Sequence, residues 1–200
     1  MSSTARKKYM SAEDYLVWEA EQPTKNEYVA GEVFAMVGVT LNHGQIAGNL
    51  SMHLGVQVRS HGCRFFVSDV KVQVEAADAF LYPDFVVSCE PGPGTSHIAA
   101  SPRLIAEILS PSTASFDRGR KLEMYRSIPT LEDYLLIDAE RVSVHRLHRT
   151  AVGPWVLEVY GRGDRFELPS VGATLAVDAL YDGVELPPPA PQGTRDPEDD

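Results

Sequence analysis

The chain has 200 residues, of which 44% are apolar, and its formal net charge is −10. This length fits one folded domain with a sizeable core, and the surplus of negative charge argues against tight nonspecific binding of nucleic acid. We expect a flexible tail at 1–10, a single domain at 11–184 and a disordered tail at 185–200, because the end of the chain is rich in proline and acid.

The sequence also limits where the protein resides. It contains no apolar stretch that approaches the length of a membrane span, and its first ten residues are basic and polar without an apolar signal core. These features predict a soluble, cytoplasmic protein without membrane contact. Cys63 and Cys89 lie far apart without paired spacing, so we expect buried thiols rather than a disulfide or a zinc site.

The N-terminal part predicts a helix, a hairpin and a second helix. Ser11 resembles a helix cap, and the short helix that follows ends before Pro23. The segments 25–29 and 32–37 have the pattern of a β-hairpin that turns at Ala30 and Gly31. Apolar residues at four-residue steps then predict an amphipathic helix over 41–60, whose Gly48 and Gly55 allow close packing against the sheet or a second subunit.

The centre of the chain places two carboxylates in apolar strands. Strands are predicted at 63–67, at 70–74, where Lys71 lies on the wetter face, at 80–89 and at 103–109. If the last two strands are antiparallel neighbours with Cys89 opposite Arg103, then Asp84 and Glu107 are within one residue of facing each other directly.

Glu107 needs a partner because it lies in the apolar run from Leu104 to Leu109. Burial of an unpaired charge costs several kcal/mol, so a cation, a metal ion or water in a cleft is expected beside it. Two level carboxylates suit a hard divalent cation such as Mg²⁺. The ordinary alternative is that Asp84 is a turn residue and that Glu107 forms a structural ion pair.

A helix that carries a lysine follows these strands. The segment 110–113 suits a helix entry, and the helix is expected over 116–128 before Pro129. Asp117, Lys121 and Tyr125 are spaced four apart and therefore share one face. The lysine could hold an attacking water or stabilise charge on a phosphoryl oxygen, whereas an exposed Asp117–Lys121 pair would be worth only a few tenths of a kcal/mol.

Three further strands are predicted at 134–138, 142–147 and 155–160. In and around the second of these lie basic residues that could contact phosphates, although edge strands also use positive charge to avoid aggregation. These residues are Arg141, His145, Arg146, His148 and Arg149.

Several of these motifs together resemble a known family. The residues that carry the resemblance are Tyr82-Pro83-Asp84, the run Glu107-Ile108-Leu109-Ser110-Pro111-Ser112-Thr113, Asp117, Lys121, Tyr125 and Tyr134-Leu135-Leu136-Ile137-Asp138. The chain resembles the restriction endonuclease family often called Uma-two, within the PD-(D/E)XK nuclease superfamily. The resemblance covers roughly 11–181. It implies an α/β (α+β) restriction-endonuclease-like core, with a mixed β-sheet flanked by helices and preceded by an N-terminal helix and hairpin.

The resemblance also implies roles for residues. Asp84 and Glu107 would hold Mg²⁺, or Mn²⁺ as a substitute, with the backbone carbonyl of Ile108 as a further ligand. Glu27, or Glu32 as the nearby alternative, would complete the metal site. The superfamily pattern places a lysine where this chain has Leu109.

Lys121 is the natural substitute for that lysine, and Lys71 is the alternative. Asp117 and Tyr125 would position Lys121, and His43 would approach the cleft, although a capping or surface histidine is the ordinary explanation for it. Arg118, Arg120, Arg146 and Arg149 are candidates for contact with nucleic acid.

The leading hypothesis is a magnesium-dependent endonuclease that hydrolyses double-stranded DNA as a homodimer. A catalytically silent DNA-binding or assembly module with the same fold is the alternative. A metal-dependent hydrolase of small phosphoesters is a third possibility.

Overall fold

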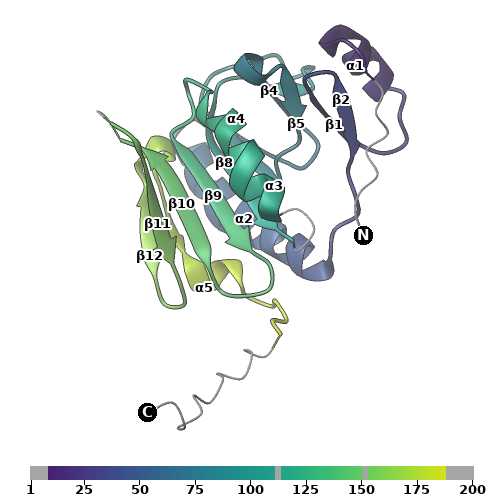
Figure 1. The fold of residues 1–200 in the computed structure, drawn as a ribbon. Helices are drawn as coiled ribbons and strands as arrows, with labels where there is room; N and C mark the ends of the chain where they lie inside the picture. Colours follow the sequence, from purple (N-terminus) through teal and green to yellow (C-terminus); the bar gives the residue numbers. More distant parts are fainter. Residues whose placement is uncertain (1–8, 111–113, 151–152, 188–200) are drawn as a thin grey trace, which may run out of the picture.

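The computed structural model describes residues 9–110, 114–150 and 153–187 (Figure 1). The helical elements are α1 (Ala12–Glu19), α2 (Leu41–Ser60), the 3₁₀ turn η1 (Glu75–Ala77), α3 (Ala114–Phe116), the π-helical turn η2 (Asp117–Lys121), α4 (Leu122–Arg126), the 3₁₀ turn η3 (Pro169–Val171) and α5 (Val177–Leu180). The strands are β1 (Asn26–Val29), β2 (Glu32–Ala35), β3 (Arg64–Val67), β4 (Lys71–Val74), β5 (Ala79–Leu81), β6 (Phe85–Ser88), β7 (Ile98–Ala99), β8 (Pro102–Leu109), β9 (Asp133–Asp138), β10 (Val144–Arg149), β11 (Trp155–Tyr160), β12 (Arg165–Leu168) and β13 (Ala173–Ala176).

The strands of the described residues form two larger sheets and one small one. The first has the order β2-β1-β5-β4-β7, the second the order β11-β10-β9-β8-β6-β3, and β12 pairs with β13 alone. In the second sheet β8 and β9 are parallel, and the other neighbours are antiparallel. This is the mixed αβ architecture that the sequence predicted.

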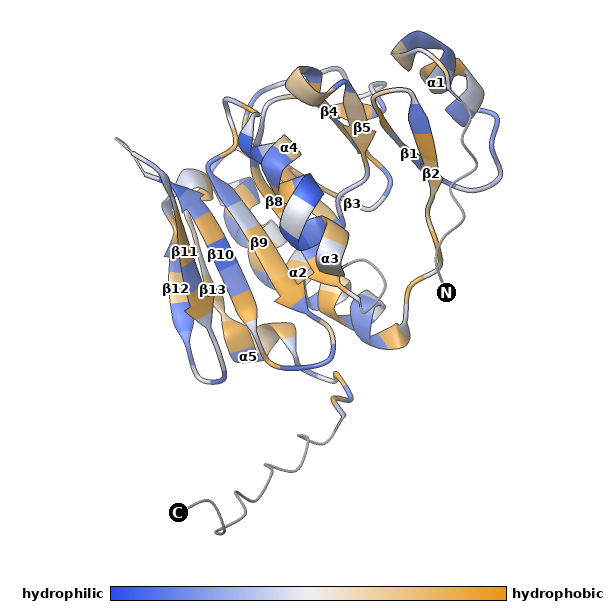
Figure 2. Ribbon diagram, in the orientation of Figure 1, coloured by the Kyte–Doolittle hydropathy of each residue, from blue (hydrophilic) through white to orange (hydrophobic). Residues whose placement is uncertain are grey.

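Helices cover both faces of the second sheet. On one face, Leu104, Ala106 and Ile108 of β8 pack with the apolar side of α2. On the other face, Ile105 and Leu109 pack with Met124 and Tyr125 of α4. Because side chains alternate along a strand, the covered strand β8 is largely apolar on both faces. In Figure 2 the central strands β8 and β9 carry mainly hydrophobic colours.

The predicted N-terminal elements are confirmed. Ser11 caps α1 by accepting a hydrogen bond from the Asp14 amide, and the β1–β2 hairpin turns at Ala30 and Gly31. Helix α2 runs over the predicted residues, and its Gly55 lies against the Phe65 ring, where an added Cβ would come within 2.5 Å. The predicted close packing of this glycine against the sheet is therefore confirmed.

The strand predicted over 80–89 is two strands in different sheets. β5 belongs to the first sheet and β6 to the second, and the chain passes between them at Tyr82, Pro83 and Asp84. Pro83 cannot donate a backbone hydrogen bond to a sheet ladder, which explains the interruption. This junction brings the two sheets together beside Asp84.

The prediction of two free thiols was wrong, because Cys63 and Cys89 form a disulfide. The antiparallel β3–β6 register pairs Arg64 with Ser88, and one further step along it places the two cysteines opposite each other. They are 26 residues apart in the chain. Only the pairing of two distant strands reveals such a contact.

The C-terminal part of the fold was not predicted. The strands β12 and β13 and the helix α5 add Phe166, Leu168, Leu175 and Leu180 to the core beside α2. The alternation of apolar and polar residues in β12 is the signal that could have indicated it. None of the helices in the described part of the chain is both long enough and apolar enough to cross a bilayer.

Candidate active site

Asp84 and Glu107 lie at one level on neighbouring strands. The β6–β8 register pairs Phe85 with Ala106, so its continuation by one step pairs these two acids. Both side chains belong to the face that carries Val86 and Ile105, because side chains alternate along a strand. The register predicted with Cys89 opposite Arg103 differs by one residue from the observed one, and the observed register puts the two acids directly level.

The carboxylate of Glu107 is held by two side chains of the covering helix. The Lys121 Nζ lies 3.1 Å from Glu107 Oε1, and the Tyr125 hydroxyl donates to the same oxygen at 3.1 Å. Glu107 is 3% exposed and Lys121 6% exposed, so this contact lies within the protein rather than in solvent. The solvated Asp117–Lys121 pair considered from the sequence is therefore not what the structure shows.

Glu27 reaches the same lysine from the other sheet. Its Oε1 lies 3.0 Å from Lys121 Nζ and also accepts a hydrogen bond from the Tyr82 amide at 3.0 Å. Tyr82 is part of the junction between the two sheets, so this bond ties Glu27 to the segment that carries Asp84. The structure places Glu27 at the site, whereas it gives Glu32, on β2, only intermediate burial.

Asp117 is the third acid around the lysine. Its Oδ1 lies 3.5 Å from Lys121 Nζ, and its side chain is buried. The Tyr134 hydroxyl, which comes from β9 beneath the helix, donates to the backbone carbonyl of Asp117 at 3.1 Å. Both ends of the π-helical turn η2 therefore face the site, and such turns occur frequently at functional sites.

His43 contacts Asp84. Its Nε2 lies 3.1 Å from Asp84 Oδ1, and the other carboxylate oxygen of Asp84 accepts the Ile108 amide at 2.7 Å. The N-terminal end of α2 is thus brought to the site, and its cap is Thr40, which accepts from the His43 amide. The structure places His43 and Ile108 beside Asp84; the predicted metal contact of the Ile108 carbonyl stays a prediction.

The acids around Lys121 affect one another. Burial raises the pKa of the Glu107 carboxyl well above its usual value; Lys121 opposes this shift, and the charges of Asp84, Asp117 and Glu27 add to it. Burial alone would lower the pKa of Lys121, but the surrounding carboxylates, Glu107 foremost, outweigh it and raise the pKa. Lys121 therefore stays charged, and Glu107 lies in a strongly negative environment.

This donor set fits a hard divalent cation. Two carboxylates lie abreast, each oxygen of Asp84 has one hydrogen-bond partner and so keeps a lone pair, and a bound cation would relieve the negative environment of Glu107. Within 9–110, 114–150 and 153–187, no three acids, histidines or cysteines form a ready metal cage. Mg²⁺ commonly uses one or two carboxylates together with water and substrate phosphate, so a cage is not required.

Leu109, at the motif position, and Lys71, the alternative lysine, are both buried. Leu109 is buried in the core beneath α4. Lys71 is buried over the Tyr82 ring, 5.1 Å from its centroid, and burial lowers its pKa. Gln73, on the same face of this strand, is exposed, so the wetter face predicted from the sequence is present there but not at Lys71. Lys121 is the lysine that contacts Glu107.

The four arginines proposed for nucleic acid differ in their availability. Arg146 is engaged by Asp133 at 2.7 Å and Glu158 at 3.1 Å, and Arg149 donates to the carbonyls of Leu131 and Ile128. These two side chains support the packing of β9, β10 and β11. By contrast, Arg120 is exposed on the helix, and Arg118 is half-buried beside His145.

Sequence reasoning missed Glu19, which supports the site from α1. Its Oε1 accepts hydrogen bonds from the Asn26 amide at 2.8 Å and from the Tyr82 hydroxyl at 3.1 Å. Glu19 thereby holds Asn26, which precedes Glu27 in the chain, and Tyr82, whose amide donates to Glu27. An acid at the end of a short helix carries no local signal for this role.

Comparisons with known proteins show the family and the fold of this chain. The profile of the family Uma2, described as "Putative restriction endonuclease", matches residues 12–178. The uncharacterized proteins slr1290 and sll1609 of Synechocystis sp. are 37% identical over 176 residues and 33% identical over 171 residues; these alignments cover 88% and 84% of this chain and 93% and 97% of the relatives.

A solved structure shares the fold. It is the crystal structure of a putative nuclease belonging to DUF820 from Anabaena variabilis, with a TM-score of 0.70 and 19% identity, covering 88% of this chain and 99% of that one. This protein therefore shares the fold of that nuclease-like structure. With the family profile matched over most of its length, the chain belongs to the Uma2 family of restriction-endonuclease-like proteins.

Proposed function

We propose that this protein is a magnesium-dependent endonuclease that hydrolyses phosphodiester bonds of double-stranded DNA. The observation that carries the proposal is the contact of Lys121 with Glu107, on the sheet face where Asp84 lies level with Glu107. Two carboxylates can hold a metal ion for phosphodiester hydrolysis, and a lysine can stabilise the negative charge that develops on the phosphoryl group. The Uma2 family membership supports this reading.

Asp84 and Glu107 are the residues that would hold the metal ion, with Glu27 next to them. A divalent ion there supplies a Lewis acid for the phosphoryl oxygen and lowers the pKa of water. His43 and the Ile108 amide orient the two oxygens of Asp84. Tyr125 fixes Glu107 by donating to Oε1.

Lys121 serves in place of the lysine that the motif would put at Leu109. Its ammonium stays charged because three carboxylates surround it, and a charged ammonium stabilises the negative charge that develops on a phosphoryl oxygen. Glu27 and Asp117 hold it from opposite sides, from β1 and from η2. The lysine is therefore positioned by two separate parts of the fold.

Plasmid cleavage tests the proposal. Supercoiled plasmid should be cut with Mg²⁺ or Mn²⁺ and remain intact with EDTA, and Asp84→Ala, Glu107→Ala and Lys121→Ala should each abolish cutting while circular dichroism shows them folded. Arg162→Ala is the control, since Arg162 is exposed in the turn between β11 and β12 and has no part in the proposed site. Cleavage that persists in the Glu107→Ala protein would overturn the proposal.

A catalytically silent DNA-binding module is the second candidate. It is favoured by one observation, the buried Leu109 at the position of the motif lysine. On this reading the wild type retains DNA in an electrophoretic shift assay but does not cut it with either metal. The plasmid experiment therefore separates the two candidates.

We also propose a homodimer. Each chain offers one constellation of Asp84, Glu107 and Lys121, and hydrolysis of both strands of a duplex by one such site per strand calls for two chains. Light scattering after size-exclusion chromatography should give twice the mass of one chain. A monomeric mass together with double-strand cleavage would contradict this arrangement.

A further inference from the structure

A second polar cluster lies on the other flank of the helix that carries Lys121. The Arg118 Nη1 lies 3.2 Å from His145 Nδ1, and its Nη2 lies 3.6 Å from Asp138 Oδ2. Arg141 donates to the same Asp138 oxygen at 2.8 Å. Two guanidinium groups therefore share one carboxylate, and exposed Glu140 is the neighbouring acid in the turn.

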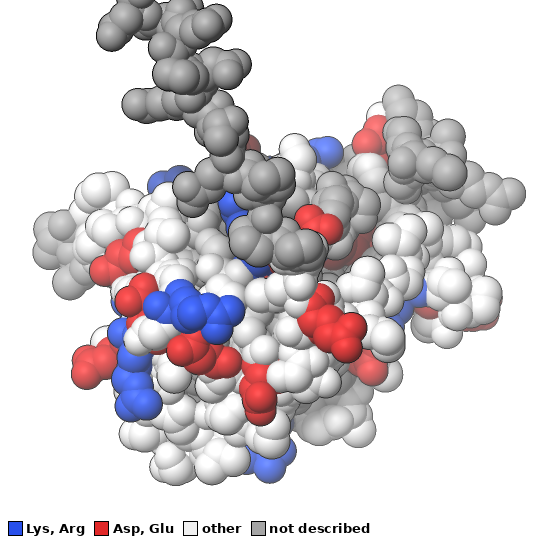
Figure 3. Space-filling view, turned by 90° about the horizontal axis from the view of Figure 1, so that it is seen from below, with Lys and Arg blue, Asp and Glu red and all other residues white. Residues whose placement is uncertain are grey.

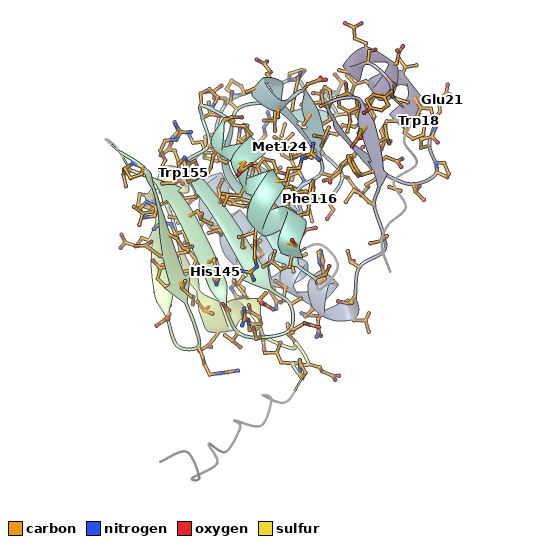
Figure 4. The ribbon with its side chains drawn as sticks, viewed as in Figure 1. Trp18, Glu21, Phe116, Met124, His145 and Trp155 are labelled. Carbon is orange, nitrogen blue, oxygen red and sulfur yellow. A yellow bond between two sulfur atoms is a disulfide. The ribbon has the colours of Figure 1, made fainter. Side chains whose placement is uncertain are left out.

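This cluster is at the same level of the sheet as the candidate active site. The β8–β9 register pairs Glu107 with Leu136, and the β9–β10 register pairs Leu136 with His145. Residues paired in this way point to one face, and Figure 4 shows His145 on the sheet beside the helix that carries Phe116. Two strand spacings put the backbones of Glu107 and His145 about 10 Å apart.

The covering helix separates the two groups of side chains. Lys121 points to Glu107 on β8 and Glu27 on β1, whereas Arg118 points to β10 and to the end of β9. Tyr134 of β9 bonds to the helix between them. Both groups of side chains lie where β8 and β9 end. A nucleic-acid strand that crosses this edge of the sheet can therefore contact both groups.

Arg118 sets the hydrogen-bonding state of His145. A guanidinium only donates, so His145 Nδ1 accepts and its proton resides on Nε2. Burial, together with Arg118 and Arg141, lowers the pKa of His145, and Asp138 opposes this. The neutral imidazole therefore presents an Nε2–H donor next to guanidinium donors.

We infer that Arg118 and His145 bind a backbone phosphate of the nucleic acid, and that this phosphate lies close to the bond that is cut. The inference rests on the proposed function. A strand of duplex DNA carries a phosphate about every 3.4 Å of axis, so groups about 10 Å from the reacting position meet a phosphate within a few nucleotides of it. Arg118 supplies charge and a forked set of donors, and His145 supplies one more donor.

The distribution of charge makes such a local contact necessary. Figure 3 shows Lys and Arg side chains beside Asp and Glu on a surface that is largely uncharged, and the chain as a whole is negative. Among the described residues in this view, basic side chains lie beside acidic ones rather than in one broad basic patch. Arg146 is held by Asp133 and Glu158, and Arg149, although exposed, donates to backbone carbonyls. Arg118 is the half-buried arginine beside the site.

Binding measured without cleavage tests the inference. Fluorescence anisotropy of a labelled duplex in EDTA, over a series of salt concentrations, gives the Kd and its salt slope. Arg118→Gln should raise Kd roughly tenfold at 0.1 M salt and reduce the slope by about 1, as loss of one phosphate contact predicts. His145→Asn should raise Kd by a smaller factor and leave the slope unchanged, because the imidazole is neutral.

Two further variants keep the result decisive. Arg118→Lys retains the charge, so this variant should keep the wild-type salt slope. If Arg118 had only a structural role, the salt slope of Arg118→Lys would be as low as that of Arg118→Gln. Arg162→Gln, a change of an exposed arginine in the turn between β11 and β12, should leave Kd within about twofold. Equal Kd and slope for Arg118→Gln and wild type would overturn the inference.

Failure of the proposed phosphate contact can be distinguished from failure of the proposed nuclease activity by measuring both binding and cleavage. If wild type binds the duplex through Arg118 but cuts no plasmid with Mg²⁺ or Mn²⁺, the phosphate contact holds and the nuclease activity does not. If wild type cuts plasmid and Arg118→Gln cuts with unchanged KM and kcat, the contact is refuted and the activity stands.

Discussion

Lys121 and Glu107 lie 3.1 Å apart, although one is on a helical turn and the other on the most buried part of a central strand. Lys121 also contacts Glu27 at 3.0 Å and Asp117 at 3.5 Å. The two sheets and the helix thus converge on one ammonium group. That convergence makes Lys121 important for stability as well as for the proposed chemistry.

Replacement of Lys121 should destabilise the protein. Lys121→Met removes the cation that three buried carboxylates share, and loss of one partner from a buried ion pair typically costs about 3–5 kcal/mol. Urea unfolding at pH 7 measures the change. Arg120→Met, at an exposed position of the same helix, should stay within about 0.5 kcal/mol; similar losses in both variants would show that Lys121 does not balance the acids.

Magnesium should stabilise the wild-type protein. An ion that binds only the folded state at a free concentration of 100 times its Kd adds about 2.7 kcal/mol, which thermal unfolding with and without EDTA detects as a higher Tm. Asp84→Asn and Glu107→Gln should lose this rise in Tm, and Asp164→Asn, at an exposed turn, should keep it. Calorimetry that detects no uptake of any divalent ion by the wild type would refute the metal site.

The disulfide should contribute measurable stability. A cross-link across 26 residues removes chain entropy from the unfolded state worth about 3 kcal/mol. The paired variant Cys63→Ala with Cys89→Ala should therefore unfold at lower urea concentration than the oxidised protein. Treatment with a reductant should lower the stability of the wild type and leave the variant unchanged; a reductant effect on both would point to another cause.

Alkaline pH should reveal the buried hydroxyl of Tyr181. Burial raises the pKa of Tyr181 to about 12 from 10.0. Because the folded protein holds this proton more tightly, the stabilisation is fully present below pH 10 and is lost as the pH rises towards 12. At about 1.4 kcal/mol per unit, the linked loss is roughly 2–3 kcal/mol at pH 12.

Tyr181→Phe isolates that contribution. The hydroxyl donates to the Asp138 carbonyl at 2.8 Å, so the variant should be less stable than wild type at pH 8 by about 1 kcal/mol. Its stability should then fall less steeply between pH 10 and 12, and the difference should shrink. Parallel curves for the two proteins across this range would contradict the assignment.

Much of the candidate site followed from local sequence patterns. The acid in the apolar run from Leu104 to Leu109 required a buried partner, and the spacing of Asp117, Lys121 and Tyr125 put them on one helical face. The level placement of Asp84 and Glu107 followed from the pattern of two strands joined by one loop. Each of these inferences depends on residues near one another in the chain, where periodicity is informative.

Other parts of the site depend on contacts between distant segments. Glu27 is 94 residues from Lys121 by their numbers in the chain, and it reaches the lysine only because β1 pairs with β5 at the junction before Asp84. His43 meets Asp84 because the start of α2 reaches the same edge of the sheet. No local pattern could have shown that Arg146 is engaged by Asp133 whereas Arg118 faces His145.

The sequence by itself determined the extent of most elements and the pair of carboxylates, because alternation, helical spacing and the cost of a buried charge act over short stretches. The class of fold and the role of Lys121 came from the resemblance to a family, which also indicated Glu27 and His43. The tertiary structure alone decided the division of the segment 80–89 between two sheets, the disulfide, and the contacts that Glu27 and His43 make at the site. These features depend on which strands pair, and strand pairing is decided by the packing of the whole core rather than by any one segment.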